Sequence, residues 1–196
     1  MKDKRRVSTY TLVLMSLLTA IVVVLQLLGS FVKFGPFSVS LVLLPISIGA
    51  ALVGVPAGGL LGLVFGIVVL LSGDAAPFLA VSVPATIALC VVKGALAGVV
   101  SGVVYSFFKK RRTLSAVLSA AVCPIVNTGV FVIFVYLFFL PTVSSWGVSS
   151  GATNVTSYIF LMMIGVNFLF ELGLNLVLSP VIVRLVQYGQ GKRLSK

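Results

Sequence analysis

Apolar residues run along this chain in long stretches, separated by short segments rich in Gly, Pro and Ser. A helix needs about 20 apolar residues to cross a bilayer, with a usual range of about 17–25. The stretches predict six transmembrane helices, near residues 10–28, 39–53, 57–71, 84–107, 114–140 and 158–183. The second and third stretches are short and are divided only at residues 54–56. A hairpin that does not fully cross the membrane is therefore an alternative for that pair.

The composition points the same way as the pattern. The chain has 196 residues, of which 60% are hydrophobic and 9% are charged, whereas a soluble domain carries about 25% charged residues. No linker composition divides it. We therefore expect a single all-α integral membrane domain over residues 1–196, folded as a six-helix transmembrane bundle.

Basic residues predict the orientation of this bundle. With six crossings, the N-terminal tail, the segment at 109–112 and the C-terminal end lie on one side, which carries twelve of the 14 Lys and Arg residues. The opposite side carries Lys33, and Lys93 lies within a span. The positive-inside rule makes the basic side cytoplasmic, and a non-crossing hairpin would leave this result unchanged. Both termini are therefore predicted to be cytoplasmic.

The net charge of +11 does not indicate nucleic-acid binding once the charges are placed. The basic residues form short clusters beside apolar spans, which is typical of membrane topology signals. We expect the lipid bilayer, and no nucleic acid, as the partner of these clusters. The twelve are Lys2, Lys4, Arg5, Arg6, Lys109, Lys110, Arg111, Arg112, Arg184, Lys192, Arg193 and Lys196.

Small residues recur every fourth position on several predicted helices. Such spacing places them on one helical face, where neighbouring backbones can approach closely. The glycines at 58, 62 and 66 in the third span, and at 94, 98 and 102 in the fourth, are interpreted as packing faces. Ser16 and Ala20 form a similar pair on the first span, which could face a helix of this chain or a partner subunit.

Polar side chains within the apolar spans are the candidate functional residues, because polar groups in hydrocarbon are costly and are usually retained for function. They are Lys93, Asn127, Asn167, Glu171 and Asn175, with Gln26 near the end of the first span. Asn167, Glu171 and Asn175 are spaced four apart and share one helical face.

Two interpretations of Lys93 and Glu171 remain open. As a buried ion pair, each charge would make the other tolerable in the membrane. As a binding site, Lys93 would meet the carboxylate of an anionic ligand, with Glu171 orienting Lys93 or accepting a ligand proton. Asn127 follows Pro124, which frees a mid-helix carbonyl, and its amide can both donate and accept hydrogen bonds.

The chain lacks the parts of an enzyme. It contains three acidic residues, Asp3, Asp74 and Glu171, and no His, so paired carboxylates and the commonest general base are missing. No P-loop motif is present. Cys90 and Cys123 lie in apolar spans, where Cys behaves as a small hydrophobe. We expect no catalytic residues, no metal site and no cofactor.

The order of several short motifs resembles the substrate-specific S components of energy-coupling factor (ECF) transporters, which are six-helix vitamin-capturing proteins of bacterial membranes. The motifs are KFGPF at 33–37, GAALVG at 49–54, LSGDAAPF at 71–78, KGALAG at 93–98 before a basic loop, and CPIVNTGVF at 123–131. Together with the basic N-terminus and the small residues of the first helix, they cover nearly the whole chain.

This resemblance implies a transport subunit of the bacterial plasma membrane. It would bind a vitamin at the outer side and dock on a transmembrane coupling protein driven by two ATPase subunits, with Ser16 and Ala20 on the docking face. The resemblance implies substrate binding by Lys93, Asn127, Asn167 and Glu171. Phe34, Phe37 and Asp74 would belong to gating loops.

The resemblance favours pantothenate weakly, because a cation beside amide groups suits a small carboxylate with hydroxyl and amide functions. Folate, lipoate, biotin and riboflavin remain open. Two other classes of function are alternatives: a stand-alone secondary transporter or channel that uses Glu171 for ion or proton coupling, and a scaffold that binds nothing small.

Overall fold

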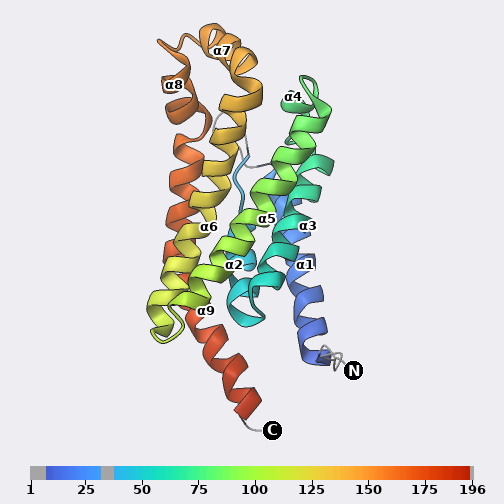
Figure 1. Cartoon of the computed structure of the whole chain (residues 1–196), viewed down its shortest axis with the longest axis vertical. Coiled ribbons are helices and arrows are strands. Elements are labelled where there is room, and N and C mark those ends of the chain that lie inside the picture. Colours follow the sequence, from blue (N-terminus) through green and yellow to red (C-terminus); the bar gives the residue numbers. More distant parts are fainter. Residues whose placement is uncertain (1–7, 32–37, 195–196) are drawn as a thin grey trace.

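The structure is a computed structural model that describes residues 8–31 and 38–194. These residues are almost entirely helical (Figure 1). The elements are α1 (Thr9–Gly29), α2 (Leu43–Leu52), α3 (Val55–Leu71), α4 (Ala76–Leu79), α5 (Val83–Phe107), α6 (Arg112–Phe134), the π-helical segment η1 (Val135–Phe139), α7 (Leu140–Ser149), α8 (Val155–Ser157), the π-helical segment η2 (Tyr158–Met163) and α9 (Gly165–Leu194).

Among the described residues, four helices are long and apolar enough to cross a membrane: Thr9–Gly29, Val83–Phe107, the continuous helical stretch Arg112–Ser149, and Gly165–Leu185. The apolar helices α2 and α3 are shorter, with 10 and 17 residues. The chain is thus an all-helical protein with apolar helices of membrane-spanning length. The count of six crossings stays a prediction.

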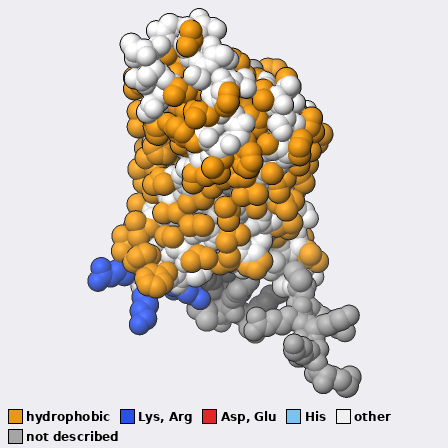
Figure 2. Space-filling view, turned by 45° about the horizontal axis from the view of Figure 1, so that its top comes forward, with side chains coloured by type: hydrophobic (Ala, Val, Ile, Leu, Met, Phe, Trp, Pro, Cys, Tyr) orange, Lys and Arg blue, Asp and Glu red, His pale blue; other side chains and the backbone are white. Residues whose placement is uncertain are grey.

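The two ends of the bundle differ in their side chains. The start of α1, the end of α9 and the turn between α5 and α6 lie together at one end, and α4 and α7 lie at the other (Figure 1). Hydrophobic side chains cover most of the face seen in Figure 2, and Lys and Arg side chains gather at one end. Residues 109–112, in the α5–α6 turn, are exposed there. We call these ends the basic end and the α4/α7 end.

Helix α2 fills the interior of the bundle in the half nearer the basic end. It contacts α1, α3, α5, α6 and α9, and seven of its ten residues are buried. A helix that is apolar all round is expected to be enclosed in this way. Ten residues extend about 15 Å, half the thickness of a bilayer core. Residues 39–42 are not helical, so the prediction of a helix at 39–53 was wrong in its first part.

The two predicted glycine faces pack against each other, as their spacing indicates. A Cβ atom on Gly62 would meet the backbone carbonyl of Gly94, and one on Gly94 would meet the carbonyl of Gly62. Gly58 and Gly98 are related in the same reciprocal way. Helices α3 and α5 therefore run antiparallel at backbone-to-backbone distance, an approach that only residues without a Cβ allow.

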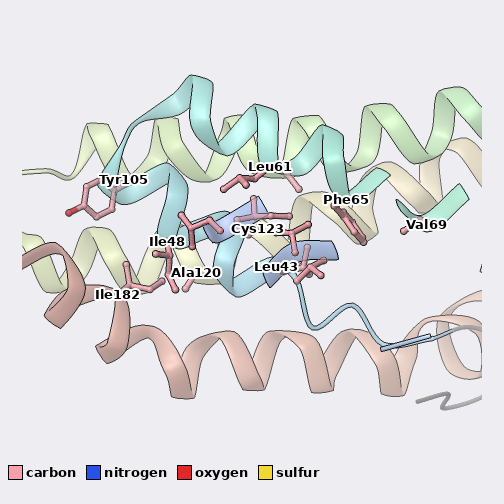
Figure 3. Packing of buried hydrophobic residues seen from close by; sticks show 14 of the residues in the cluster. Leu43, Ile48, Leu61, Phe65, Val69, Tyr105, Ala120, Cys123 and Ile182 are labelled. Atoms are coloured by element: carbon pink, nitrogen blue, oxygen red, sulfur yellow. The ribbon is translucent and has the colours of Figure 1, made fainter. Parts of the chain in front are cut away.

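Packed side chains surround α2. Leu43 and Ile48 of this helix lie among Leu61, Phe65 and Cys123 of the neighbouring helices (Figure 3). Beside them, the hydroxyls of Ser101 and Ser119 lie 2.8 Å apart, and each donates to the other residue's carbonyl at 3.0 Å. This reciprocal contact joins α5 to α6 and leaves no polar group of the two serines without a partner.

The segment between the predicted fifth and sixth spans is largely helical. Helices α7 and α8 occupy most of residues 141–157. Pro141 does not end the helix because it lies in the first turn of α7, where a missing N–H costs nothing. The ring of Phe78 in α4 packs edge-on against Phe139 and Trp146, at centroid distances of 4.8 and 5.6 Å. These contacts join α4 to α7 across the end of the bundle.

Candidate functional site

A cavity lies in the half of the bundle nearer the α4/α7 end. It offers about 90 Å³ to the centre of a water-sized sphere, where a single water needs about 10–15 Å³. The space therefore suits a small organic molecule rather than one or two waters. Its walls come from helices α1, α3, α4, α5, α6 and α9, from the segment η2, and from the residues just before α2.

The four residues predicted to bind substrate all line this cavity. Lys93 comes from α5, Asn127 from α6, and Asn167 and Glu171 from α9. Residues 167, 168 and 171 form the cavity face of α9, and residues 163 and 164, which precede this helix, continue the wall. The four-residue spacing of Asn167 and Glu171 places both side chains on this face.

Lys93 is half-buried, and its neighbours are aromatic. Its Nζ lies 5.4 Å from the ring centroid of Phe65 and 5.8 Å from that of Phe131. A cation is attracted to the face of an aromatic ring at such distances. Within the described part of the chain, no ion pair joins Lys93 to Glu171. The ammonium group of Lys93 therefore lies at the cavity without a direct ion pair to a described residue.

Glu171 is buried and is held by a different group. Its Oε1 accepts a hydrogen bond from the backbone N–H of Ser40, at 2.7 Å. Ser40 lies in the non-helical segment before α2, and both Ser38 and Ser40 line the cavity. The carboxylate therefore joins α9 to a segment 131 residues earlier in the chain.

Asp74, the second acidic residue at the cavity, is also engaged within the protein. Its Oδ2 accepts hydrogen bonds from Gln26 Nε2 at 2.8 Å and from Ser72 Oγ at 3.2 Å. Gly73, with φ of 86°, allows the tight turn that brings this carboxylate over the end of α1. Phe34 and Phe37, the other predicted gate residues, lie outside the described residues.

Two buried amides at the cavity keep acceptor atoms that the protein does not use. Gln26 Oε1 and Asn127 Oδ1 have no hydrogen-bond partner among the described residues, although Gln26 is 1% and Asn127 5% exposed. Buried polar atoms are nearly always paired in folded proteins, by protein, water or ligand. These two oxygens are therefore available to donors of a bound molecule.

Other lining residues were not predicted from the sequence. Thr86 lies on the same face of α5 as Lys93, seven residues earlier, so helical periodicity could have found it. Ser38 and Ser40 carry no such signal. Asn175, grouped with Asn167 and Glu171 by spacing, does not line the cavity; its Nδ2 donates to the carbonyl of Glu171 at 2.8 Å.

Ser16 and Ala20 lie away from the cavity, on the exposed surface of α1. Leu12, Val13 and Leu17 are exposed on the same part of the helix. The pair is therefore exposed rather than packed against the described helices of this chain. Contact with a partner subunit stays a prediction.

The comparison with protein families agrees with this arrangement. The family model described as the ECF transporter, substrate-specific component, matches residues 10–183. No curated protein matches the chain. Members of this family are substrate-binding components of transporters and not enzymes, in keeping with a polar cavity inside apolar helices. The chain belongs to the family of substrate-specific components of ECF transporters.

Proposed function

We propose that this subunit captures a small vitamin carboxylate, pantothenate in the first instance, and delivers it through an ATP-driven ECF complex. The observation that carries the proposal is the state of the three charged side chains at the cavity. The carboxylates of Asp74 and Glu171 accept hydrogen bonds from the protein, whereas the ammonium of Lys93 lies near two aromatic rings and forms no hydrogen bond or ion pair with the described residues. Lys93 is therefore the charged group whose donors are free for a ligand, which favours an anionic group at this point of the cavity.

The polar groups around Lys93 suit the rest of such a molecule. Unused amide oxygens of Gln26 and Asn127 can accept from hydroxyl or amide groups of the ligand. Thr86 and Thr128 add hydroxyls to the cavity wall, and Phe78, Leu89 and Met163 add apolar surface. An anion-binding cation, a few amides and an apolar wall together match a small carboxylate with hydroxyl and amide groups.

The direction of capture follows from the positive-inside rule. If the basic end faces the cytoplasm of a bacterial cell, both termini are cytoplasmic and the cavity lies in the outer half of the membrane. A single domain over residues 1–196 would then receive its vitamin from outside. Delivery requires a transmembrane coupling protein and two ATPase subunits. We propose the exposed face at Ser16 and Ala20 as the docking surface for the coupling protein.

Mass spectrometry of small molecules that co-purify with the chain tests the substrate. We expect a carboxylate of vitamin size, released on denaturation, and binding of added pantothenate by the purified subunit without ATP. A panel of vitamins that includes folate, lipoate, biotin and riboflavin serves as the comparison. If none of these binds and nothing co-purifies, the proposed function is wrong.

Liposomes that contain this chain alone test the alternative of a stand-alone transporter. We expect binding but no sustained uptake, because the chain has no P-loop and its buried carboxylate at 171 is held by Ser40. Sustained uptake driven by an ion or proton gradient would favour a secondary transporter instead.

A further inference from the structure

The segment at residues 38–42 is an unusual element for the interior of an apolar bundle. It is not helical, yet Val39 and Val42 have 0% exposure. Ser38 and Ser40 line the cavity, while the carbonyl of Val39 lies against Gly29 of α1. The alternation of Ser38, Val39 and Ser40 is that of an extended chain, in which successive side chains point to opposite sides, and residues 41 and 42 form the turn that leads into α2. The segment is therefore a wall of the cavity.

An extended wall of this kind needs partners for its backbone. A non-helical segment forms few hydrogen bonds within itself, and at membrane depth it is tolerated only where it is enclosed by protein or lines a polar cavity. The Ser40 N–H lies at the middle of the segment, and its acceptor is the Glu171 carboxylate at 2.7 Å. At this distance the side-chain oxygen of Glu171 is a full acceptor for the backbone N–H.

The two ends of the segment are held differently. Its far end continues into α2, which contacts five other helices. Its near end adjoins residues that the structure does not describe. Between these two ends, the hydrogen bond from the Ser40 N–H to Glu171 connects the segment to α9, the helix that also carries Asn167.

We propose that Glu171 is a positioning residue: it holds the 38–42 segment as a wall of the cavity, and it acts on the ligand through that segment rather than by contact of its own charge. The proposal rests on the proposed function in treating the cavity as the substrate site. It assigns to Glu171 neither an ion pair with Lys93 nor ion coupling. A neutral acceptor of the same shape can then replace the carboxylate.

Hydrogen–deuterium exchange of the full-length protein in nanodiscs tests the positioning role without any vitamin. The readout is the exchange rate of the amides at 38–42. In Glu171→Leu, which cannot accept a hydrogen bond, we expect exchange to become about tenfold faster. In Glu171→Gln, whose amide oxygen can accept from Ser40, the rate should remain close to that of the wild type.

A matched pair at the donor avoids changing α9. Ser40→Pro removes the backbone N–H, whereas Ser40→Ala keeps it and removes only the hydroxyl. We expect Ser40→Pro to exchange about as fast as Glu171→Leu, and Ser40→Ala to exchange more slowly than Ser40→Pro because it keeps the backbone donor. If Glu171→Leu does not fold, the pair at Ser40 decides alone. Unchanged exchange in the folded Glu171→Leu or Ser40→Pro variant would overturn the proposal.

Pantothenate binding to the same variants separates positioning from ligand contact. We expect Glu171→Gln to bind as the wild type does, and Glu171→Leu and Ser40→Pro to bind about tenfold more weakly. Equal losses in Glu171→Gln and Glu171→Leu would mean that the carboxylate itself touches the ligand, and the proposal would fail. If the wild type binds no pantothenate, the substrate proposed above is wrong, and the exchange rates still decide the role of Glu171.

Discussion

The two halves of the bundle use the same helices in different ways. Toward the basic end, the interior is occupied by α2, a helix enclosed by five others. Beside it, the buried side chains of Ser101 and Ser119 form hydrogen bonds with each other's residue. Toward the α4/α7 end, the residues just before α2, at 38–42, are not helical, and a cavity lies beside them. There, the buried oxygens Gln26 Oε1 and Asn127 Oδ1 have no partner among the described residues. We call the first the packing half and the second, where we propose that substrate binds, the binding half; α2 begins at the boundary between them.

The largest effect is expected from a methyl group in the packing half. Gly62→Ala places a Cβ on the backbone carbonyl of Gly94, so α3 and α5 must separate. We expect a loss of about 2–3 kcal/mol in the free energy of unfolding, measured by denaturant titration in detergent. Gly129→Ala is the matched control: its Cβ would meet nothing within 4 Å, and Ala is the better helix former. Equal stability of the two variants would contradict the close contact of the two helices.

A change of charge in the binding half should leave the fold intact. Lys93→Met keeps the length and apolar stem of the side chain and removes the cation. We expect pantothenate affinity to fall by about 100-fold, the effect of losing a charge-assisted pair of about 2–3 kcal/mol, with an unchanged melting temperature. Isothermal titration calorimetry and thermal unfolding measure the two quantities. A collapse of the fold in this variant would instead favour a structural role for Lys93.

Asn127 tests whether the unused acceptors belong to the ligand. Asn127→Leu removes an oxygen that has no partner among the described residues, so stability should be equal or higher while pantothenate affinity falls about tenfold. The same change at Asn175, which lies outside the cavity wall, serves as the control for binding. Equal affinities of the two variants would argue against contact between Asn127 and the ligand.

The smallest effect is expected from the serine contact between α5 and α6. Ser119→Ala removes one side of the reciprocal pair with Ser101, and interhelical hydrogen bonds in membrane proteins contribute about 0.6 kcal/mol on average. We expect a loss of that order in unfolding free energy and no change in ligand affinity. A double-mutant cycle with Ser101→Ala would isolate the coupling between them. A clear loss of affinity would show that the two halves are not independent.

The sequence predicted well what depends on local composition. Long apolar runs identified α1, α5, α6 and α9, because the length and hydrophobicity of a spanning helix are local properties. The four-residue spacing of Asn167 and Glu171 placed both on one face, and both line the cavity with Lys93 and Asn127. Polar residues in apolar helices converge because each must avoid lipid.

What the sequence could not predict depends on contacts between distant residues. Residues 39–42 are as apolar as those of α2, and hydropathy does not distinguish an enclosed extended segment from a helix. The partner of Glu171 is a backbone N–H 131 residues away, and that of Asp74 is Gln26, 48 residues away. A backbone donor carries no residue signature. From the sequence alone, the more obvious partner for Glu171 is therefore the opposite charge of Lys93.

The enclosure of α2 also bears on how the protein is made. Helix α2 ends at Leu52 and α9, one of the helices around it, begins at Gly165, so more than 100 residues must be synthesised before the enclosure can close. At about 5–20 residues per second, this takes roughly 5–20 s. During this time the Ser40 N–H lacks its acceptor, and the short apolar helix α2 lacks its contacts with α9. Completion of the cavity is thus a late event in biogenesis, and a ribosome stalled before α9 would leave a chain that lacks the α9 wall of this cavity.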